Sequence, residues 1–341
     1  MGTDSKLGVA VIGTGRAGMI HAGNFARGVR GSLLVALADA VESSVRAAGV
    51  ELGIAATYTD YRSALEHPGV DAVVIATPTS RHAEIAIAAA EHGKHVLCEK
   101  PMAITVAECD AMLEATERAG VSLQIGFMRR YSEDFLAAKA RIDAGDIGTV
   151  VQVKTLTHGP SEPKPWMHDL RHSNGPLAEV NSHDIDTVRW LSGSEFTDVY
   201  AIAGNFRTPQ ARSSYPDFYD QVLAITRMSN GSQGSISGAQ GVQYAYDARC
   251  EILGTEGIIS VGSFSGLEVV TCTREKIMSR PSVSSWTSLF AAAYLREDAE
   301  FIQCIWQERR PRACGRDGRA AVALVNAGNQ SIRERRAVAL S

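Results

Sequence analysis

The chain has 341 residues, of which 45% are hydrophobic and 21% are charged, and its formal net charge is −4. This length favours about two domains, each large enough to bury a core of its own. The slightly acidic balance gives no electrostatic reason to expect nucleic acid or an acidic membrane as a partner. No apolar run approaches the roughly 20 residues of a membrane-spanning helix, so we expect no membrane partner.

The cysteines and the N-terminus indicate a compartment. The six cysteines are scattered and form no Cys-x-x-Cys pair, which is typical of reduced thiols rather than of a disulfide framework or a zinc ribbon. The first six residues lead directly into an expected strand and leave no room for a signal peptide. We therefore expect a cytoplasmic protein.

The most informative segment begins at residue 8, where an apolar run leads into Gly-Thr-Gly-Arg-Ala-Gly. A strand, a glycine-rich turn and a helix in this order are typical of a dinucleotide-binding site. Gly13 permits the tight turn, Gly15 lets the backbone approach a pyrophosphate, and Gly18 lets the helix pack closely on the strand. The pyrophosphate would rest at the helix N-terminus, where free N–H groups and the dipole favour anions.

Asp39 ends the next apolar run. It lies at about the spacing of 20 residues expected for an acid that binds the ribose 2′-hydroxyl. A 2′-phosphate would meet like charge there, so we expect NAD rather than NADP. Thr77 and Pro78, at the end of another strand, are expected to border the nicotinamide. The full set expected to bind the cofactor is Gly13, Thr14, Gly15, Arg16, Ala17, Gly18, Asp39, Thr77, Pro78, Glu99 and Lys100.

The first 126 residues alternate between strand and helix patterns. After Asp39 we expect, in order, a helix over 41–52, a strand at 56–58, a helix over 61–66, a buried strand at 72–76, a helix capped by Ser80 and ending near 91, a strand at 95–98, a helix over 106–119 and a strand at 122–126. This alternation predicts a doubly wound parallel sheet. The carboxyl ends of its strands would form a ligand-binding crevice.

From residue 127 the pattern changes to runs of strands. We expect a helix over 133–144, strands near 150–157, 199–205, 221–228, 231–238, 248–253 and 258–261, a helix over 184–191, a serine-rich loop at 279–288 and a helical tail from 291 that breaks at 310–311. Such runs predict a largely antiparallel sheet with helices on one face. We therefore expect an α/β chain with a dinucleotide-binding domain at 1–126. An α+β domain with a large, mostly antiparallel open sheet would follow at 127–341, and its terminal helix has room to pack back on the first domain.

Glu99-Lys100-Pro101 follows a strand of the parallel sheet, at the expected crevice. Proline keeps the preceding residue extended, which fixes the direction of Lys100. A lysine there can donate to a substrate hydroxyl or join a proton relay, although relay chemistry requires a lowered pKa. A surface ion pair between Lys100 and Glu99 is the alternative interpretation.

A second segment places Glu179 four residues before His183. If the segment is helical, the two side chains share one face. A carboxylate beside an imidazole raises its basicity and fixes its tautomer, which suits a general base that takes a hydroxyl proton during hydride transfer. A helix-start histidine with the capping acids Asp184 and Asp186 is the alternative.

His158, His168, His172 and His183 also raise the question of a metal site, because two of them are spaced i,i+4. No familiar ligand pattern is completed and no cysteine lies nearby. We expect no metal.

With these segments in place, the chain resembles the Gfo/Idh/MocA oxidoreductase family, and within it the inositol 2-dehydrogenase branch. The resemblance extends from Lys6 to about Arg333. The Glu-Lys-Pro and His-Asp-x-Asp segments are the most specific to this family. The segments that carry the resemblance are 13–18, Glu99-Lys100-Pro101, Gly126-Phe127-Met128-Arg129-Arg130-Tyr131, His183-Asp184-Ile185-Asp186, Tyr244-Ala245-Tyr246-Asp247, 250–254 and 315–319.

The resemblance implies an N-terminal Rossmann domain and a C-terminal domain whose open sheet often forms an oligomer interface, so a homodimer or homotetramer is expected. It implies that His183 is the acid/base and that Lys100 positions the reacting hydroxyl. It also implies substrate contacts from Arg129, His158 and Tyr246.

The chain departs from the family pattern at Glu179, where aspartate is usual, and at Asn174-Gly175-Pro176, where a Gly-Gly doublet is common. Taken as a whole, the resemblance implies an NAD-dependent dehydrogenase that oxidises a ring hydroxyl of a cyclic polyol, with Lys100, His183 and Glu179 as catalytic residues. Two alternatives stay open: a sugar, aminosugar or glycoside dehydrogenase of the same family, and a non-catalytic dinucleotide-binding sensor.

Overall fold

The computed structural model of the chain describes residues 6–262 and 285–340. The chain forms two compact units: unit 1 is Met1–Tyr131 with Ala291–Arg319, and unit 2 is Ser132–Phe290 with Ala320–Ser341. The return of Ala291–Arg319 to the N-terminal part means that unit 1 is built from two separate stretches of chain. The domain boundary expected after residue 126 stays a prediction, because the two units are compact groups of residues and do not show which part of the chain folds by itself. Most of the serine-rich loop expected at 279–288 lies outside the described residues.

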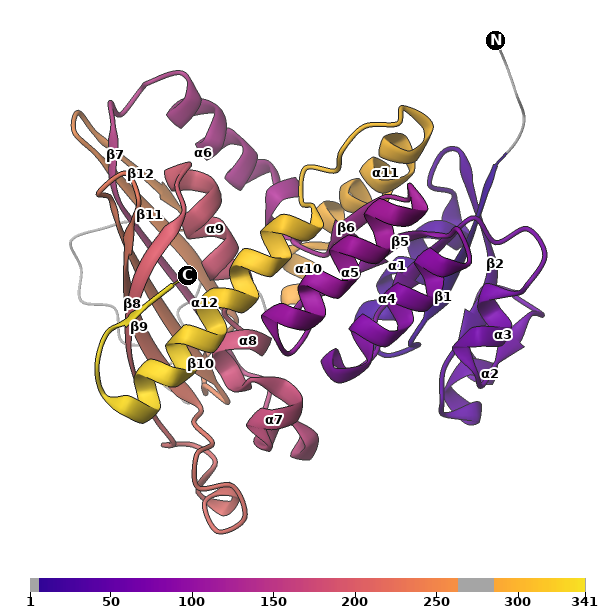
Figure 1. The fold of residues 1–341 in the computed structure, drawn as a ribbon, viewed down its shortest axis with the longest axis horizontal. Coiled ribbons are helices and arrows are strands. Elements are labelled where there is room, and N and C mark those ends of the chain that lie inside the picture. Colours follow the sequence, from indigo (N-terminus) through magenta and orange to yellow (C-terminus); the bar gives the residue numbers. More distant parts are fainter. Residues whose placement is uncertain (1–5, 263–284, 341) are drawn as a thin grey trace. The chain divides into compact units, whose positions relative to one another are not determined.

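Unit 1 contains a six-stranded parallel sheet in the order β3-β2-β1-β4-β5-β6. This order, in which the succession of strands reverses between β1 and β4, is that of a dinucleotide-binding sheet. Figure 1 labels strands β1, β2, β5 and β6 of this sheet. The elements of unit 1 are β1 (Leu7–Ile12), α1 (Arg16–Arg27), β2 (Ser32–Ala38), α2 (Glu42–Leu52), β3 (Thr57–Tyr58), α3 (Tyr61–Leu65), β4 (Ala72–Ile75), η1 (Thr79–Arg81), α4 (His82–Glu91), β5 (His95–Cys98), α5 (Val106–Ala119), β6 (Leu123–Ile125), η2 (Met128–Tyr131) and α11 (Ala291–Trp306).

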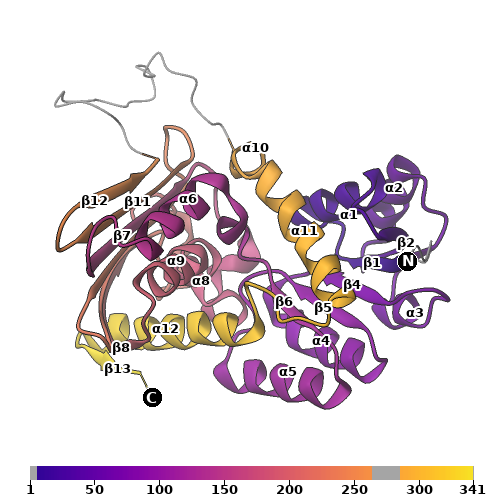
Figure 2. The same ribbon diagram turned by 90° about the horizontal axis from the view of Figure 1, so that it is seen from above.

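Helices cover both faces of this sheet. Figure 2 shows α1, α2 and α11 on one side of the strands and α3, α4 and α5 on the other. The central strands are apolar throughout, and all four residues of β4 are buried, as expected for a parallel strand with both faces covered. Ser80 does not cap a helix as expected, because α4 begins only at His82, after the 3-10 turn η1.

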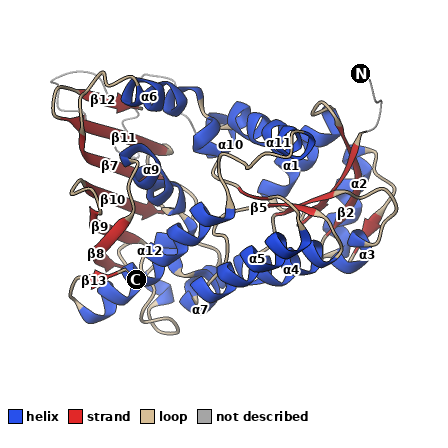
Figure 3. Ribbon diagram, turned by 45° about the horizontal axis from the view of Figure 1, so that its top comes forward, coloured by secondary structure: helices blue, strands red, loops and turns tan. Residues whose placement is uncertain are grey.

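Unit 2 is built on a seven-stranded sheet in the order β12-β11-β7-β10-β9-β8-β13, drawn in red in Figure 3. Helix α9 contacts β7 and β10 on one face of it. The elements are α6 (Glu133–Asp143), β7 (Val150–Gly159), η3 (Pro165–His168), α7 (Leu170–Ser173), α8 (Gly175–Glu179), α9 (Ser182–Ser192), β8 (Phe196–Gly204), η4 (Pro209–Ala211), β9 (Gln221–Met228), β10 (Gln233–Gln240), β11 (Asp247–Gly254), β12 (Ile258–Val261), α10 (Trp286–Leu289) and β13 (Val338–Ala339), with α12 (Gly315–Glu334) running from unit 1 into unit 2.

The expected fold class is confirmed: a parallel sheet in the first unit and a mostly antiparallel sheet in the second. Two features of the second sheet were not expected. β7 and β10 pair in parallel within an otherwise antiparallel sheet, and the two-residue strand β13 adds an edge beside β8. Two residues are too few to form a periodic pattern. Among the described residues, no helix has the length and apolarity needed to cross a membrane.

Candidate active site

The three glycines of the turn between β1 and α1 differ in what a side chain would meet. Gly13 has a φ of +98°, and a Cβ there would lie 2.5 Å from the carbonyl oxygen of Ala76. A Cβ on Gly18 would lie 1.8 Å from the carbonyl oxygen of Gly13, whereas one on Gly15 would meet nothing within 4 Å. Gly13 and Gly18 are therefore required by the chain itself. Gly15 leaves open space, which is what a pyrophosphate needs to approach the backbone.

The start of α1 supports an anion site at the same place. Arg16 and Ala17 begin its first turn, and its N-cap residue, Gly15, has no side chain that could cap it. Helix N-terminal N–H groups without a side-chain acceptor can bind a phosphate oxygen. The open space before Gly15 and the uncapped helix end therefore fit the pyrophosphate of NAD.

Asp39, directly after β2, is bonded to the glycine turn. Its Oδ2 accepts hydrogen bonds from the backbone N–H of Thr14 at 2.7 Å and from the Thr14 hydroxyl at 3.0 Å. Its Oδ1 accepts from the backbone N–H of Val41 at 2.9 Å. The carboxylate is half-buried, so it can both order the turn and reach a ribose hydroxyl.

The loops after β4 and β5 carry the other expected cofactor residues, Thr77, Pro78, Glu99 and Lys100. His82 joins these two loops, because its Nε2 lies 2.9 Å from the Thr77 carbonyl oxygen and its Nδ1 lies 2.8 Å from that of Pro101. Burial lowers the pKa of His82. The sequence did not indicate this residue, since a lone histidine at the start of an alanine-rich helix carries no spacing signal.

Glu99 is only 5% exposed, so the surface ion pair considered as an alternative does not describe it. Its Oε2 accepts the backbone N–H of Lys100 at 3.0 Å, and its Oε1 lies 3.2 Å from Nε2 of His21. Arg129, expected to contact substrate, lies in η2 and is 1% exposed. The sequence did not single out His21, which lies on α1.

In unit 2, Glu179 and His183 are not on one helix. Glu179 is the last residue of α8, and His183 is the second residue of α9, after a break at Val180-Asn181. The condition under which the two side chains would share one helix face is therefore not met. The amide of Asn181 donates to the carboxylate of Asp184 at 2.8 Å and to the carbonyl oxygen of Ser237 at 3.2 Å. These bonds fix the break, and with it the start of α9, against strand β10.

His158, at the end of β7, belongs to a polar cluster within unit 2. Its Nδ1 lies 2.8 Å from the Tyr244 hydroxyl and its Nε2 lies 3.0 Å from the Ser237 hydroxyl. Burial lowers its pKa, although the nearby carboxylates of Asp247 and Asp184 oppose the shift. A Cβ on Gly159 would lie 3.9 Å from the ring of Tyr246. His158 and Tyr246 therefore both lie near the end of β7, as a shared role in binding requires.

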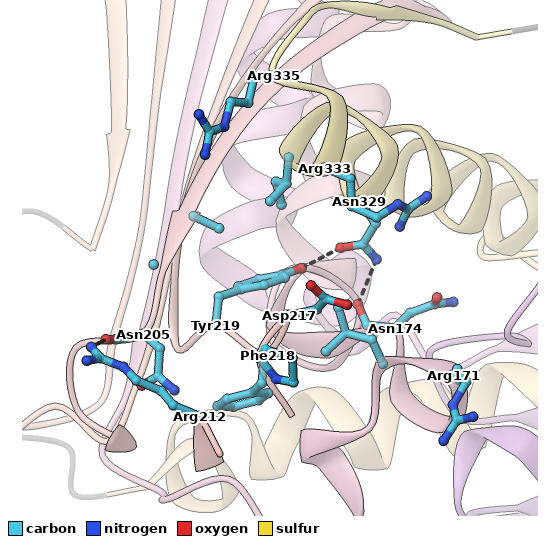
Figure 4. A pocket seen from close by; sticks show the side chains of 15 residues that line it. Arg171, Asn174, Asn205, Arg212, Asp217, Phe218, Tyr219, Asn329, Arg333 and Arg335 are labelled. Atoms are coloured by element: carbon cyan, nitrogen blue, oxygen red, sulfur yellow. Dashed lines mark hydrogen bonds between the residues drawn. The ribbon is translucent and has the colours of Figure 1, made fainter. Parts of the chain in front are cut away.

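Unit 2 also holds a cavity of about 850 Å³, shown in Figure 4. The Tyr219 hydroxyl donates to Oδ1 of Asn329 at 2.8 Å, and Nδ2 of Asn329 donates to the carbonyl oxygen of Asn174 at 2.9 Å. Arg171 and Arg212 lie at separate edges of the cavity and do not converge on one point (Figure 4). The two bonds of Asn329 tie the segment that leads to Glu179 to helix α12.

The possible metal pair is divided between two elements. His168 is in η3 and packs against Phe218, with ring centroids 4.8 Å apart and the ring planes tilted by 59°. His172 is in α7, 3.8 Å from Asp169. Within residues 6–262 and 285–340, no group of three potential ligands is arranged to hold a metal ion.

Two family models match this chain. The model described as "Oxidoreductase family, NAD-binding Rossmann fold" matches residues 7–127, and that of the "GFO/IDH/MocA C-terminal domain" matches residues 135–260. The chain belongs to the GFO/IDH/MocA family. As a member of the GFO/IDH/MocA family, it is an NAD-dependent oxidoreductase that acts on CH–OH groups.

Relatives in the GFO/IDH/MocA family match along almost the whole chain. A scyllo-inositol 2-dehydrogenase (NAD(+)) of Bacillus subtilis is 34% identical over 90% of this chain and 89% of its own. A myo-inositol 2-dehydrogenase of Thermotoga maritima is 31% identical over 97% of this chain and 98% of its own. The crystal structure of myo-inositol 2-dehydrogenase from Lactobacillus plantarum has a TM-score of 0.88 at 28% identity, covering 99% of this chain and 100% of that one. The similarity to these relatives therefore covers both units of the chain.

Proposed function

We propose that this oxidoreductase oxidises a ring hydroxyl of a cyclic polyol, namely myo- or scyllo-inositol or a related cyclitol, to the ketone. The observation that carries the proposal is the match to two inositol 2-dehydrogenases over at least 90% of this chain. Lys100 and His183, implied by the family resemblance as the catalytic pair, are both present.

The proposed roles divide between the two units. Bound NAD supplies the hydride acceptor. His183 accepts the hydroxyl proton, Lys100 holds the hydroxyl oxygen, and Glu179 stabilises the charged imidazole. Asp39 binds the ribose, and the backbone at Gly15 lies against the pyrophosphate. The remaining proposed contacts are Gly13, Thr14, Arg16, Ala17, Gly18, Thr77, Pro78 and Glu99 to the cofactor, and Arg129, His158 and Tyr246 to the polyol.

A sugar, aminosugar or glycoside is the second candidate substrate class. Glu179 supports it, because one more methylene than aspartate moves the carboxylate by more than about 1 Å. A site that hydrogen-bonds one hydroxyl rejects an analogue without it by about 10⁴-fold. A small change of this kind is therefore sufficient to select another ring.

We also propose that the protein acts in the cytoplasm, as its scattered cysteines indicate, and that it forms a homo-oligomer through the open sheet of unit 2. The sheet exposes apolar side chains on β8 and β9, which support the second point.

The test is turnover on a panel of myo-inositol, scyllo-inositol, glucose and an aminosugar, each with NAD and with NADP. We expect reduction of NAD with at least one cyclitol. Turnover only on the sugars would favour the second candidate. NAD binding without turnover on any compound would favour the non-catalytic sensor.

His183→Ala tests the assignment of the base. We expect turnover to fall by about 10²-fold or more, since a positioned general base contributes that much, while the Kd for NAD stays the same. The matched control is His172→Ala, because the His172 side chain is 63% exposed and has no proposed role. If NAD binding is lost while turnover per bound cofactor is kept, His183 is not the base.

A further inference from the structure

Unit 1 buries a group of four ionisable side chains, of which only Glu99 has a role in the proposed function. His21 lies on α1, Glu99 follows β5, and Glu297 and Asp298 lie on α11. The exposed fractions of His21, Glu297 and Asp298 are 0%, and that of Glu99 is 5%. Such residues are rarely buried completely, because removing charge from water costs free energy unless the groups pair with one another. We refer to these four residues as the buried cluster.

His21 lies between two carboxylates of the cluster. Its Nδ1 lies 2.6 Å from Oδ1 of Asp298, and its Nε2 lies 3.2 Å from Oε1 of Glu99. Only the imidazolium form has two N–H donors, so two carboxylate acceptors select the charged ring. Burial lowers the pKa of His21, but Asp298 and Glu99 together raise it well above its ordinary value. Burial raises the pKa of Glu99, but His21 and Lys100 lower it below its ordinary value.

The other contacts hold this arrangement in place. The amide of Asn24 donates to the second oxygen of Asp298 at 2.7 Å. The ring of Tyr294 meets that of His21 edge to face, with centroids 5.3 Å apart. Burial and the carboxylates of Glu99 and Asp298 raise the pKa of Glu297 well above its ordinary value. Asn24 and Tyr294 therefore hold Asp298 and His21 in their places in the cluster.

The buried cluster is connected to Lys100 by a hydrogen bond between the Glu99 side chain and the Lys100 backbone. One oxygen of Glu99 faces His21, and the other accepts the N–H of Lys100 at 3.0 Å. Gly126 leaves room for this carboxylate, since a Cβ there would lie 3.0 Å from both Cδ and Oε2 of Glu99. A rigid Glu99 therefore fixes the backbone from which the Lys100 side chain extends.

We propose that His21 is a positioning residue for the oxidation: held by Asp298, it orients the Glu99 carboxylate, which in turn fixes Lys100 for the substrate hydroxyl. The proposal rests on the role proposed above for Lys100. Displacement of a reacting group by about 1 Å can cost about 10²-fold in rate. Loss of the two N–H donors of His21 is therefore expected to lower turnover although His21 itself touches no substrate.

A double-mutant cycle on the full-length enzyme with NAD and its best polyol tests this. We expect His21→Gln to lower kcat by about tenfold or more, with less than about a threefold change in the Kd for NAD. In the Lys100→Ala background we expect His21→Gln to have no further effect, because residues that act through one group are not additive. Glu99→Gln retains an oxygen for the Lys100 N–H and a neutral partner for His21, so it should keep more activity than His21→Gln.

His67→Gln is the matched control, because His67 is hydrogen-bonded to the Tyr58 hydroxyl at 2.8 Å elsewhere in unit 1; its kcat should equal that of the parent. If His21→Gln does not fold, Asp298→Asn takes its place in the same cycle. Additive losses, or an unchanged kcat in the His21 variant while Lys100→Ala is inactive, would overturn the positioning role alone. Full turnover by Lys100→Ala would instead refute the proposed function of Lys100.

Discussion

The glycines of the nucleotide turn show how one residue type serves two purposes. At Gly18, the absence of a side chain allows α1 to approach the carbonyl oxygen of Gly13, where a Cβ would lie at 1.8 Å. At Gly15 a Cβ would meet nothing within 4 Å, so the fold itself does not require glycine there, and the proposed reason for the missing side chain is the approach of a ligand. A substitution with alanine should separate the two effects.

We expect Gly18→Ala to destabilise the protein by about 1–3 kcal/mol or more, because overpacking against backbone forces α1 to move. Gly15→Ala should leave the melting temperature within about 1 °C, since its φ of −73° suits alanine, and should weaken NAD binding about tenfold or more because the methyl group occupies the pyrophosphate position. Thermal unfolding and calorimetric titration with NAD measure the two effects. Equal NAD affinity for Gly15→Ala and the parent would contradict the assignment of this turn.

Asp39 has both a structural and a recognition role to test. Asp39→Asn keeps a carbonyl oxygen for the N–H of Thr14 but removes the negative charge. We expect the ratio of kcat/KM for NAD to that for NADP to fall about tenfold or more, because the repulsion of a 2′-phosphate is lost. Steady-state kinetics with both cofactors measure the ratio. If the preference is unchanged, another group reads the ribose.

At the scale of elements, α11 brings Glu297 into the interior of unit 1. Neither of its carboxyl oxygens has a hydrogen-bond partner among the described residues. Because its pKa is raised in the folded state, the native protein binds a proton that the unfolded chain releases above about pH 4.3. Stability therefore falls with rising pH between the unfolded and the folded pKa of this group.

Glu297→Gln removes this titration and keeps the shape. We expect the variant to gain stability relative to the parent from pH 5 to pH 8, by at most about 1.4 kcal/mol per pH unit. His21 and Glu99 are present in both proteins, so their contributions to the difference largely cancel. Denaturant unfolding at several pH values measures the difference. Glu114→Gln, at a side chain that is 79% exposed on α5, should show no such trend, and a flat difference for Glu297→Gln would show that Glu297 is charged.

At the scale of the whole molecule, the sheet of unit 2 exposes apolar residues on strands β8 and β9. Tyr200 pairs with Ile225 and Ile202 pairs with Leu223, so these four side chains are neighbours on one face. Their exposed fractions are 39%, 55%, 53% and 45%. A contiguous apolar patch of this kind is typical of a protein–protein interface.

We expect Ile225→Lys to convert the proposed homo-oligomer into a smaller species, because a lysine buried at the centre of an apolar interface has no partner. Light scattering of the purified protein measures the mass. Val50→Lys, at a residue that is 87% exposed in unit 1, should leave the mass unchanged. A parent protein that is monomeric, or a variant with the mass of the parent, would contradict an interface on this sheet.

Local patterns were sufficient for most of the elements and for the nucleotide turn. Each of the apolar runs at β1, β4 and β5 is a signal within a few neighbouring residues. The glycine-rich turn and Asp39 also lie close together in the chain. Periodicity reports which faces are buried, and a glycine-rich turn reports its own backbone requirement. These signals also predicted a helix over 184–191, although α9 begins two residues earlier, at Ser182, and so includes His183.

Only the tertiary structure revealed the partners that lie far apart in the chain. His21 and Asp298 are 277 positions apart, and no periodicity links a histidine on α1 with a carboxylate on α11. No local sequence pattern predicted the parallel pairing of β7 with β10. The same holds for the bonds of His82 to two loops. A segment's own sequence states what it must bury, whereas its partner is selected by the packing of all other segments at once.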